Sequence, residues 1–151
     1  MKRSPALMAF SREHHTALVW AKRAQREGFI ASETLMTQLV AVFDGELEPH
    51  FVAEETNLLP FLQQHGQHDL VARTLTEHRI LRDEIERIRG GHVEAVASFG
   101  KALETHVRFE ERLLFVAAET LAFPGTVAGK EKRNQQSHDD CFQCRSKELQ
   151  P

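Results

Sequence analysis

The stretch His50-Phe51-Val52-Ala53-Glu54-Glu55-Thr56-Asn57-Leu58-Leu59 decides how the chain folds. Residues four apart lie on the same face of an α-helix, so His50 and Glu54 point in one direction. Apolar residues at helical spacing point the same way; they are Leu39, Phe43, Leu47, Leu58 and Phe61. A buried carboxylate is very costly unless it is paired or bound to a metal. The stretch therefore predicts a long amphipathic helix whose buried face carries a polar pair in need of partners.

Amphipathic patterns of the same period recur in three other segments. The sequence predicts helices at about 11–27, 33–63, 69–89 and 93–121. Ser11 and Ser32 are the expected N-caps, Gly28 the expected end of the first helix, and Pro49 the cause of a kink just before His50. Because no segment shows strand alternation, the predicted fold is an all-α, antiparallel up-down four-helix bundle. An all-α domain of another topology is the alternative.

Length and charge limit the organisation of the chain. The 151 residues suit one bundle domain, 1–125, followed by a polar segment, 126–151, that is predicted to be a flexible tail. The net charge of −3 argues against a nucleic acid or an anionic membrane as partner. No apolar run is long enough to span a bilayer, and no apolar segment of a signal peptide follows the N-terminus. A cytoplasmic location is therefore expected.

The tail contains a His-x-x-Cys-x-x-Cys spacing made by His138, Cys141 and Cys144. Structural zinc sites usually draw on two separated ligand pairs, and only one Cys-x-x-Cys pair is present. Two free thiols on a flexible tail is the favoured interpretation. A zinc knuckle or a redox switch is the alternative.

Every predicted helix has a histidine on its apolar face, and two helices add a glutamate one turn later. The inner stripe of the third helix comprises Val71, Thr74, Leu75, His78, Leu81, Ile85 and Ile88. That of the fourth comprises Val96, Phe99, Leu103, His106, Glu110, Leu113 and Ala117. In the first helix His14 lies with Ala17, Leu18, Ala21 and Ala24. The six inward polar residues are thus His14, His50, Glu54, His78, His106 and Glu110.

Four imidazoles and two carboxylates form a suitable ligand set for two divalent metals. A single inward histidine is more often a hydrogen-bonded core residue than a metal ligand. A single inward glutamate is as often part of a buried ion pair or a functional cleft as it is a ligand. Together they predict a metal site, because no cation on the inner faces can pair the carboxylates; Arg82 lies at a margin where it reaches water. Glu55 and Glu111 are predicted to point outward.

The four motifs resemble those of the hemerythrin-like, or HHE cation-binding, domain family over about residues 7 to 123. They are Arg12-Glu13-His14-His15-Thr16-Ala17-Leu18, His50-Phe51-Val52-Ala53-Glu54-Glu55, Glu77-His78-Arg79-Ile80-Leu81 and His106-Val107-Arg108-Phe109-Glu110-Glu111. The resemblance implies two iron ions in a non-haem di-iron centre. It implies His14, His50, His78 and His106 as terminal ligands, with Glu54 and Glu110 as bridges. Zinc or manganese are the substitute metals.

Two departures from the oxygen-carrying members bear on function. Arg82 stands where those proteins have a second histidine on the third helix, and Glu110 stands where they have an aspartate. Fewer histidine ligands leave more open positions, which disfavours reversible oxygen carriage and favours oxidation, peroxide or nitric oxide chemistry. His15 is the alternative ligand for one such position.

The resemblance implies a domain that binds or senses oxygen, nitric oxide or redox state, with a small diatomic ligand as its partner. One alternative is a di-iron enzyme or an iron-delivery protein, acting in peroxide or nitric oxide detoxification or in repair of iron centres. The other is a metal-storage or structural bundle containing zinc. The sequence leaves open whether the protein is an enzyme and whether it has a protein partner.

Overall fold

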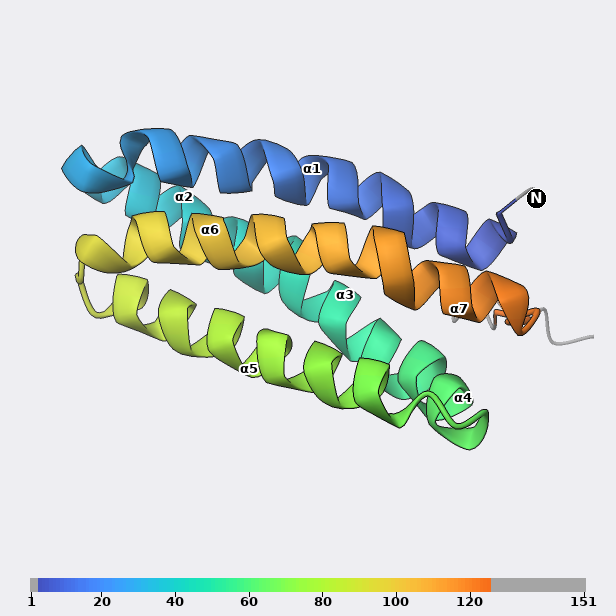
Figure 1. Cartoon of the computed structure of the whole chain (residues 1–151). Coiled ribbons are helices and arrows are strands. Elements are labelled where there is room, and N and C mark those ends of the chain that lie inside the picture. The colour runs from blue at the N-terminus through green and yellow to red at the C-terminus, as the bar shows by residue number, and fades with distance from the viewer. Residues whose placement is uncertain (1–2, 126–151) are drawn as a thin grey trace, which may run out of the picture.

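Residues 3–125 of a computed structural model of the chain are described here. The first long segment is α1 (Pro5–Glu27), and the second joins α2 (Glu33–Val42), α3 (Glu48–Ala53) and α4 (Leu59–Gln64) in one line. The third is α5 (His68–Arg89), and the fourth joins α6 (Glu94–Phe109) to α7 (Phe115–Thr120). Figure 1 shows the four segments running alternately in opposite directions. Residues 3–125 contain no strand, and the predicted antiparallel four-helix bundle is confirmed.

Local sequence signals explain where the segments begin. The Ser32 hydroxyl accepts a hydrogen bond from the Leu35 amide at 3.2 Å, so the predicted cap is confirmed. The prediction for the first helix was wrong, because α1 begins at Pro5 rather than near Ser11. Ser4 is its N-cap, and a proline at the first helical position needs no amide partner. The first helix is thus longer than expected by almost two turns.

Three turns of the long helices have π-helical geometry: η2 (Phe43–Leu47), η3 (Glu54–Leu58) and η4 (Glu110–Leu114). In η3 the Glu54 carbonyl accepts from the Leu59 amide, five residues on. η2 and η3 each end two residues before a proline, Pro49 and Pro60. A proline ring clashes with the carbonyl four residues earlier in an α-helix, and a wider turn relieves that clash. The second segment therefore continues past Pro49 through a π-helical turn.

The π-helical turns correct several predicted core positions. Each adds one residue to its turn, so the buried face moves on by one position. After η4, Leu114 and Ala118 are buried, whereas Leu113 is 50% exposed and Ala117 only partly buried. After η3, Leu62 is buried in place of Phe61, which is only partly buried. Leu75 is a separate case: α5 has no π-helical turn, and Leu75 lies at the margin of its apolar stripe and is exposed.

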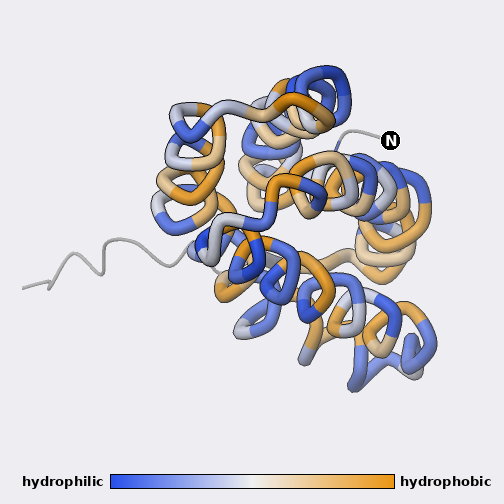
Figure 2. The backbone as a smooth tube through the Cα atoms, turned by 90° about the vertical axis from the view of Figure 1, so that its left-hand side faces the viewer, coloured by the Kyte–Doolittle hydropathy of each residue, from blue (hydrophilic) through white to orange (hydrophobic). Residues whose placement is uncertain are grey.

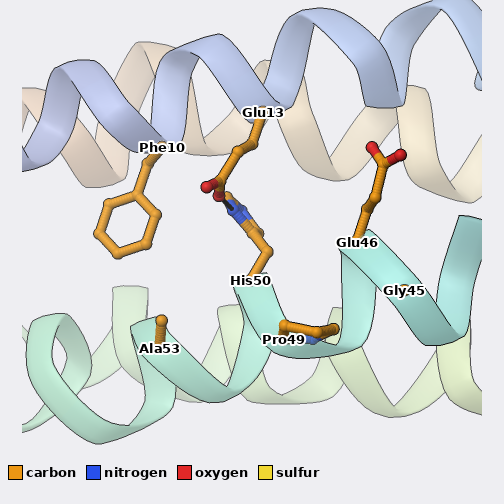
Figure 3. Close-up of a pocket in the computed structure, with 7 residues that line it drawn as sticks. All are labelled: Phe10, Glu13, Gly45, Glu46, Pro49, His50 and Ala53. Carbon is orange, nitrogen blue, oxygen red and sulfur yellow. Dashed lines mark hydrogen bonds and ion pairs between the residues drawn. The ribbon is translucent and has the colours of Figure 1, made fainter. Parts of the chain in front are cut away.

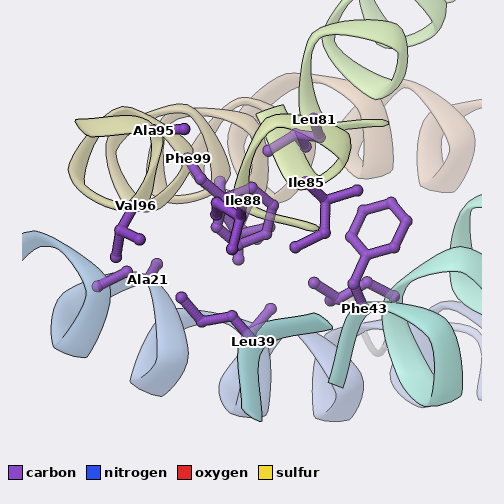
Figure 4. Packing of buried hydrophobic residues seen from close by; sticks show 14 of the residues in the cluster. Ala21, Leu39, Phe43, Leu81, Ile85, Ile88, Ala95, Val96 and Phe99 are labelled. Carbon is purple, nitrogen blue, oxygen red and sulfur yellow. The ribbon is translucent and has the colours of Figure 1, made fainter. Parts of the chain in front are cut away.

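The apolar core has two parts, one on each side of the buried polar residues. Figure 2 looks nearly along the bundle, and hydrophobic segments alternate with hydrophilic ones along each coil. Residues of α1, α2, α5 and α6 pack together in the first part (Figure 4), among them Ala21, Leu39, Ile85 and Phe99. The second part lies near α4 and α7 and includes Leu62. Within residues 3–125, no helix has the length and apolar character needed to cross a membrane.

Helices α1 and α6 approach so closely that Gly100 has no room for a side chain. A Cβ atom there would lie 2.6 Å from the Ala21 carbonyl oxygen and 2.9 Å from the Ala24 Cβ. We expect Gly100→Ala to lower the free energy of unfolding by about 1–3 kcal/mol through overpacking, despite alanine's better helix propensity. Urea unfolding measures this, with Gly45→Ala as control because, apart from its chain neighbours and its own helical backbone, no atom lies within 4 Å of a Cβ there. Equal stabilities of the two variants would contradict the prediction.

Candidate metal centre

The six predicted polar residues lie together in the middle of the bundle, and every long helical segment contributes. The histidines lie on α1, α3, α5 and α6, and the two glutamates are the first residues of η3 and η4. None of the six is more than 4% exposed. The structure thus brings together His14, His50, Glu54, His78, His106 and Glu110.

The Nε2 atoms of the four histidines face the two glutamate side chains. Nε2 of His14 lies 3.0 Å from a Glu110 oxygen, and Nε2 of His106 lies 3.3 Å from the other. Nε2 of His50 and of His78 each lie 3.4 Å from a Glu54 oxygen. The six divide into two groups whose potential ligand atoms lie within 4.8 Å of one another: His14, His50, Glu54 and Glu110, and Glu54, His78, His106 and Glu110. The two glutamates belong to both groups.

Several of these inward atoms have no hydrogen-bond partner in the described part of the chain. They are both carboxylate oxygens of Glu54 and of Glu110, and Nε2 of His78 and of His106. A buried polar atom without a partner costs about 1–3 kcal/mol, and more if it is charged. Arg82 does not supply the missing charge, because it pairs with Glu48 and Glu55. Clustered imidazole nitrogens and carboxylate oxygens without partners fit a divalent cation.

Burial disfavours the charged forms of these groups when no metal is bound. Burial raises the pKa of Glu54 well above its ordinary value, and the nearby Glu110 carboxylate adds to this effect. Burial likewise raises the pKa of Glu110. Burial lowers the pKa of His78 to about 2, with help from the positive charges of His106 and Arg82. The His78 imidazole is therefore neutral at physiological pH, as a metal ligand must be.

A second set of carboxylates lies within hydrogen-bonding distance of Nδ1, the outer ring nitrogen, of each of the four inner histidines. Nδ1 of His14 lies 2.9 Å from Glu111, and that of His50 lies 2.5 Å from Glu13. Nδ1 of His78 lies 2.7 Å from Glu55, and that of His106 lies 3.0 Å from Glu77. When a carboxylate accepts a hydrogen bond from Nδ1, the tautomer is fixed and Nε2 is free to bind a metal. All four imidazoles are thus oriented as ligands.

These outer contacts form a closed ring around the bundle. Each long segment supplies one glutamate to the histidine of the next: the first to the second, the second to the third, the third to the fourth, and the fourth back to the first. Orientation of the ligands therefore depends on all four packing contacts between neighbouring segments.

Sequence reasoning missed these outer carboxylates. Glu55 and Glu111 were expected to lie outward in water; they do lie outside the inner pair, but they are only 27% and 29% exposed and each contacts a histidine. Despite burial, hydrogen bonds with His14 and Arg3 lower the pKa of Glu111 to about 2. The four outer glutamates could have been found in the sequence by their position, because each one directly precedes or follows one of the six inner residues.

The other histidines lie outside the cluster. His15, the alternative ligand, is exposed. His65, His68 and His92 are also exposed. The tail predictions, including those for His138, Cys141 and Cys144, concern residues 126–151 and lie outside the described residues.

Comparisons with known proteins agree with this geometry. A search of curated proteins and a search of solved structures each found no match. The family model described as the hemerythrin HHE cation binding domain matches residues 7–118, a range that contains all six inner residues and all four outer glutamates. The chain belongs to the hemerythrin HHE cation-binding domain family.

Proposed function

We propose that the chain holds two iron ions between His14, His50, Glu54, His78, His106 and Glu110, and uses them to bind or sense a small diatomic molecule. The observation that carries this proposal is the pair of four-residue groups that share Glu54 and Glu110. Two ions with two common carboxylates account for all the buried atoms without partners.

The donor set supports iron. Each group offers two imidazoles and two carboxylates, and no sulfur ligand lies among them. Imidazole suits iron, copper and zinc, whereas carboxylates shift the preference toward iron and manganese. When bound, an iron pair supplies redox electrons and coordination positions that the protein leaves open.

The walls of the centre support a small neutral ligand. Phe51 stacks on the His78 ring at 4.1 Å between centroids, and Phe115 stacks on the His14 ring at 5.1 Å. Phe10 meets the His50 ring edge-on at 5.2 Å. These rings pack against three of the four imidazoles and give the centre apolar walls. Oxygen and nitric oxide are small and uncharged, so they fit such a site.

Metal analysis of protein purified without oxygen tests the proposal. We expect about two iron ions per chain, because two groups of four ligands are present. Addition of air or nitric oxide is expected to change the visible absorption spectrum. A colourless protein containing zinc would contradict the proposal and favour a structural or storage role. Steady turnover of peroxide or nitric oxide would assign the same centre to an enzyme.

A further inference from the structure

One pocket reaches the ligand cluster from the surface. It has a volume of about 270 Å³, lies between α1 and the segment from η2 to α3, and includes His50 in its lining. Figure 3 shows Glu13 and Phe10 pointing from α1 toward His50, with Glu46 and Ala53 pointing back toward α1. Glu13 and Glu46 are the charged residues of this lining, and both are acidic. A cleft lined by one sign of charge concentrates ions of the opposite sign.

Glu13 differs from the other three outer carboxylates. Arg3 pairs with Glu111, Arg82 with Glu55 and Arg73 with Glu77. Within residues 3–125, no arginine or lysine is paired with Glu13. Its side chain is 56% exposed, against 29%, 27% and 18% for the other three. Among the four histidine–glutamate contacts of the ring, the contact at His50 therefore involves the most accessible carboxylate.

From this asymmetry we propose that the pocket is the port through which divalent cations reach the centre, with Glu13 as the residue that transfers them. The proposal rests on the metal-binding function proposed above. A hydrated cation is attracted to Glu46 and Glu13 at the rim. Glu13 already contacts Nδ1 of His50, whose Nε2 lies inside the cluster. Movement of the Glu13 side chain together with the His50 ring gives a cation access to the cluster. The other three histidine–glutamate contacts, whose glutamates pair with arginines, stay in place.

The kinetics of cobalt uptake by the full-length, metal-free protein test the port. Co²⁺ binding is followed by its visible absorption after rapid mixing, and final content is measured by metal analysis. We expect Glu13→Gln/Glu46→Gln to load about tenfold more slowly at low salt and to lose most of the salt dependence of the rate. Ala53→Leu, which fills the pocket with apolar atoms, is expected to load severalfold more slowly and to reach the wild-type content.

Two matched variants separate a port from a general disturbance of the ligands. Glu55→Gln makes the same chemical change in an outer glutamate that pairs with Arg82 and lies outside the pocket. Ala53→Ser changes the same pocket residue but leaves most of the pocket volume empty. We expect Glu55→Gln to weaken binding but to retain the salt dependence of the uptake rate, and Ala53→Ser to load like the wild type. Wild-type uptake rates in both Ala53→Leu and the double variant would overturn the port while leaving the proposed function intact. A wild-type protein that binds no metal would overturn both.

Discussion

Replacement of Glu110 by alanine is expected to reduce the bound metal from about two ions per chain to one or fewer. Glu110 belongs to both four-residue groups, so its loss removes a ligand from each. It also leaves Nε2 of His14 and of His106 without the carboxylate oxygens that they face. The measurement is metal content after loading and removal of free metal, because loss of a shared ligand weakens both sites at once.

Glu111→Ala is the matched control, one residue along the same turn. Glu111 contacts Nδ1 of His14 and the Arg3 guanidinium, and it faces away from the shared carboxylates. Loss of such an outer partner typically lowers metal affinity about 10- to 100-fold, so two ions should still bind at sufficient concentration. Equal metal content in Glu110→Ala and the wild type would contradict the shared-ligand assignment.

The inner polar residues could be predicted from the sequence because steps of three and four residues lead along each apolar stripe to them. In the second segment these steps continue through the wider turn η2 to His50 and Glu54, and the structure has all six residues buried. Immediately after each glutamate the period changes, because η3 and η4 have wider turns. The sequence offers Pro60 as a signal for the first of these turns. It offers no proline for the second, so Leu114 could not be distinguished from Leu113.

The outer glutamates could not be predicted from one helix at a time. A residue next to an inward residue is turned by about 100°, so it faces sideways along the boundary between two helices. Whether it reaches water or a neighbour depends on the distance to the adjacent helix. In this bundle close packing, such as that at Gly100, lets Glu111 reach His14 from the fourth segment. The ring of contacts is therefore a property of packing.

Glu54→Gln is expected to weaken metal binding in both four-residue groups and yet to stabilise the metal-free protein. The unfolded chain releases the Glu54 proton near pH 4.3, whereas the folded, metal-free chain retains it to a much higher pH because burial raises the pKa. The folded state then binds more protons than the unfolded state, so stability falls as pH rises above about 4.3 through the raised pKa. Glutamine has no such proton to lose. At pH 7 the variant should be more stable than the metal-free wild type, by at most about 4 kcal/mol, which is the free energy of ionising the Glu54 carboxyl of the unfolded chain between pH 4.3 and pH 7.

Urea unfolding in the presence of a chelator, at several values between pH 5 and pH 8, measures this gain, which should grow with pH. Glu111→Gln provides a control of opposite sign. The pKa of Glu111 is lowered to about 2, so its ionised form stabilises the fold above the unfolded pKa, and that stabilisation is lost as pH falls toward 2. Its replacement should therefore destabilise the metal-free protein at neutral pH. A metal-free Glu54→Gln protein that is less stable than the metal-free wild type at every pH would contradict the prediction. It would mean that the Glu54 carboxylate already has a partner in the metal-free fold.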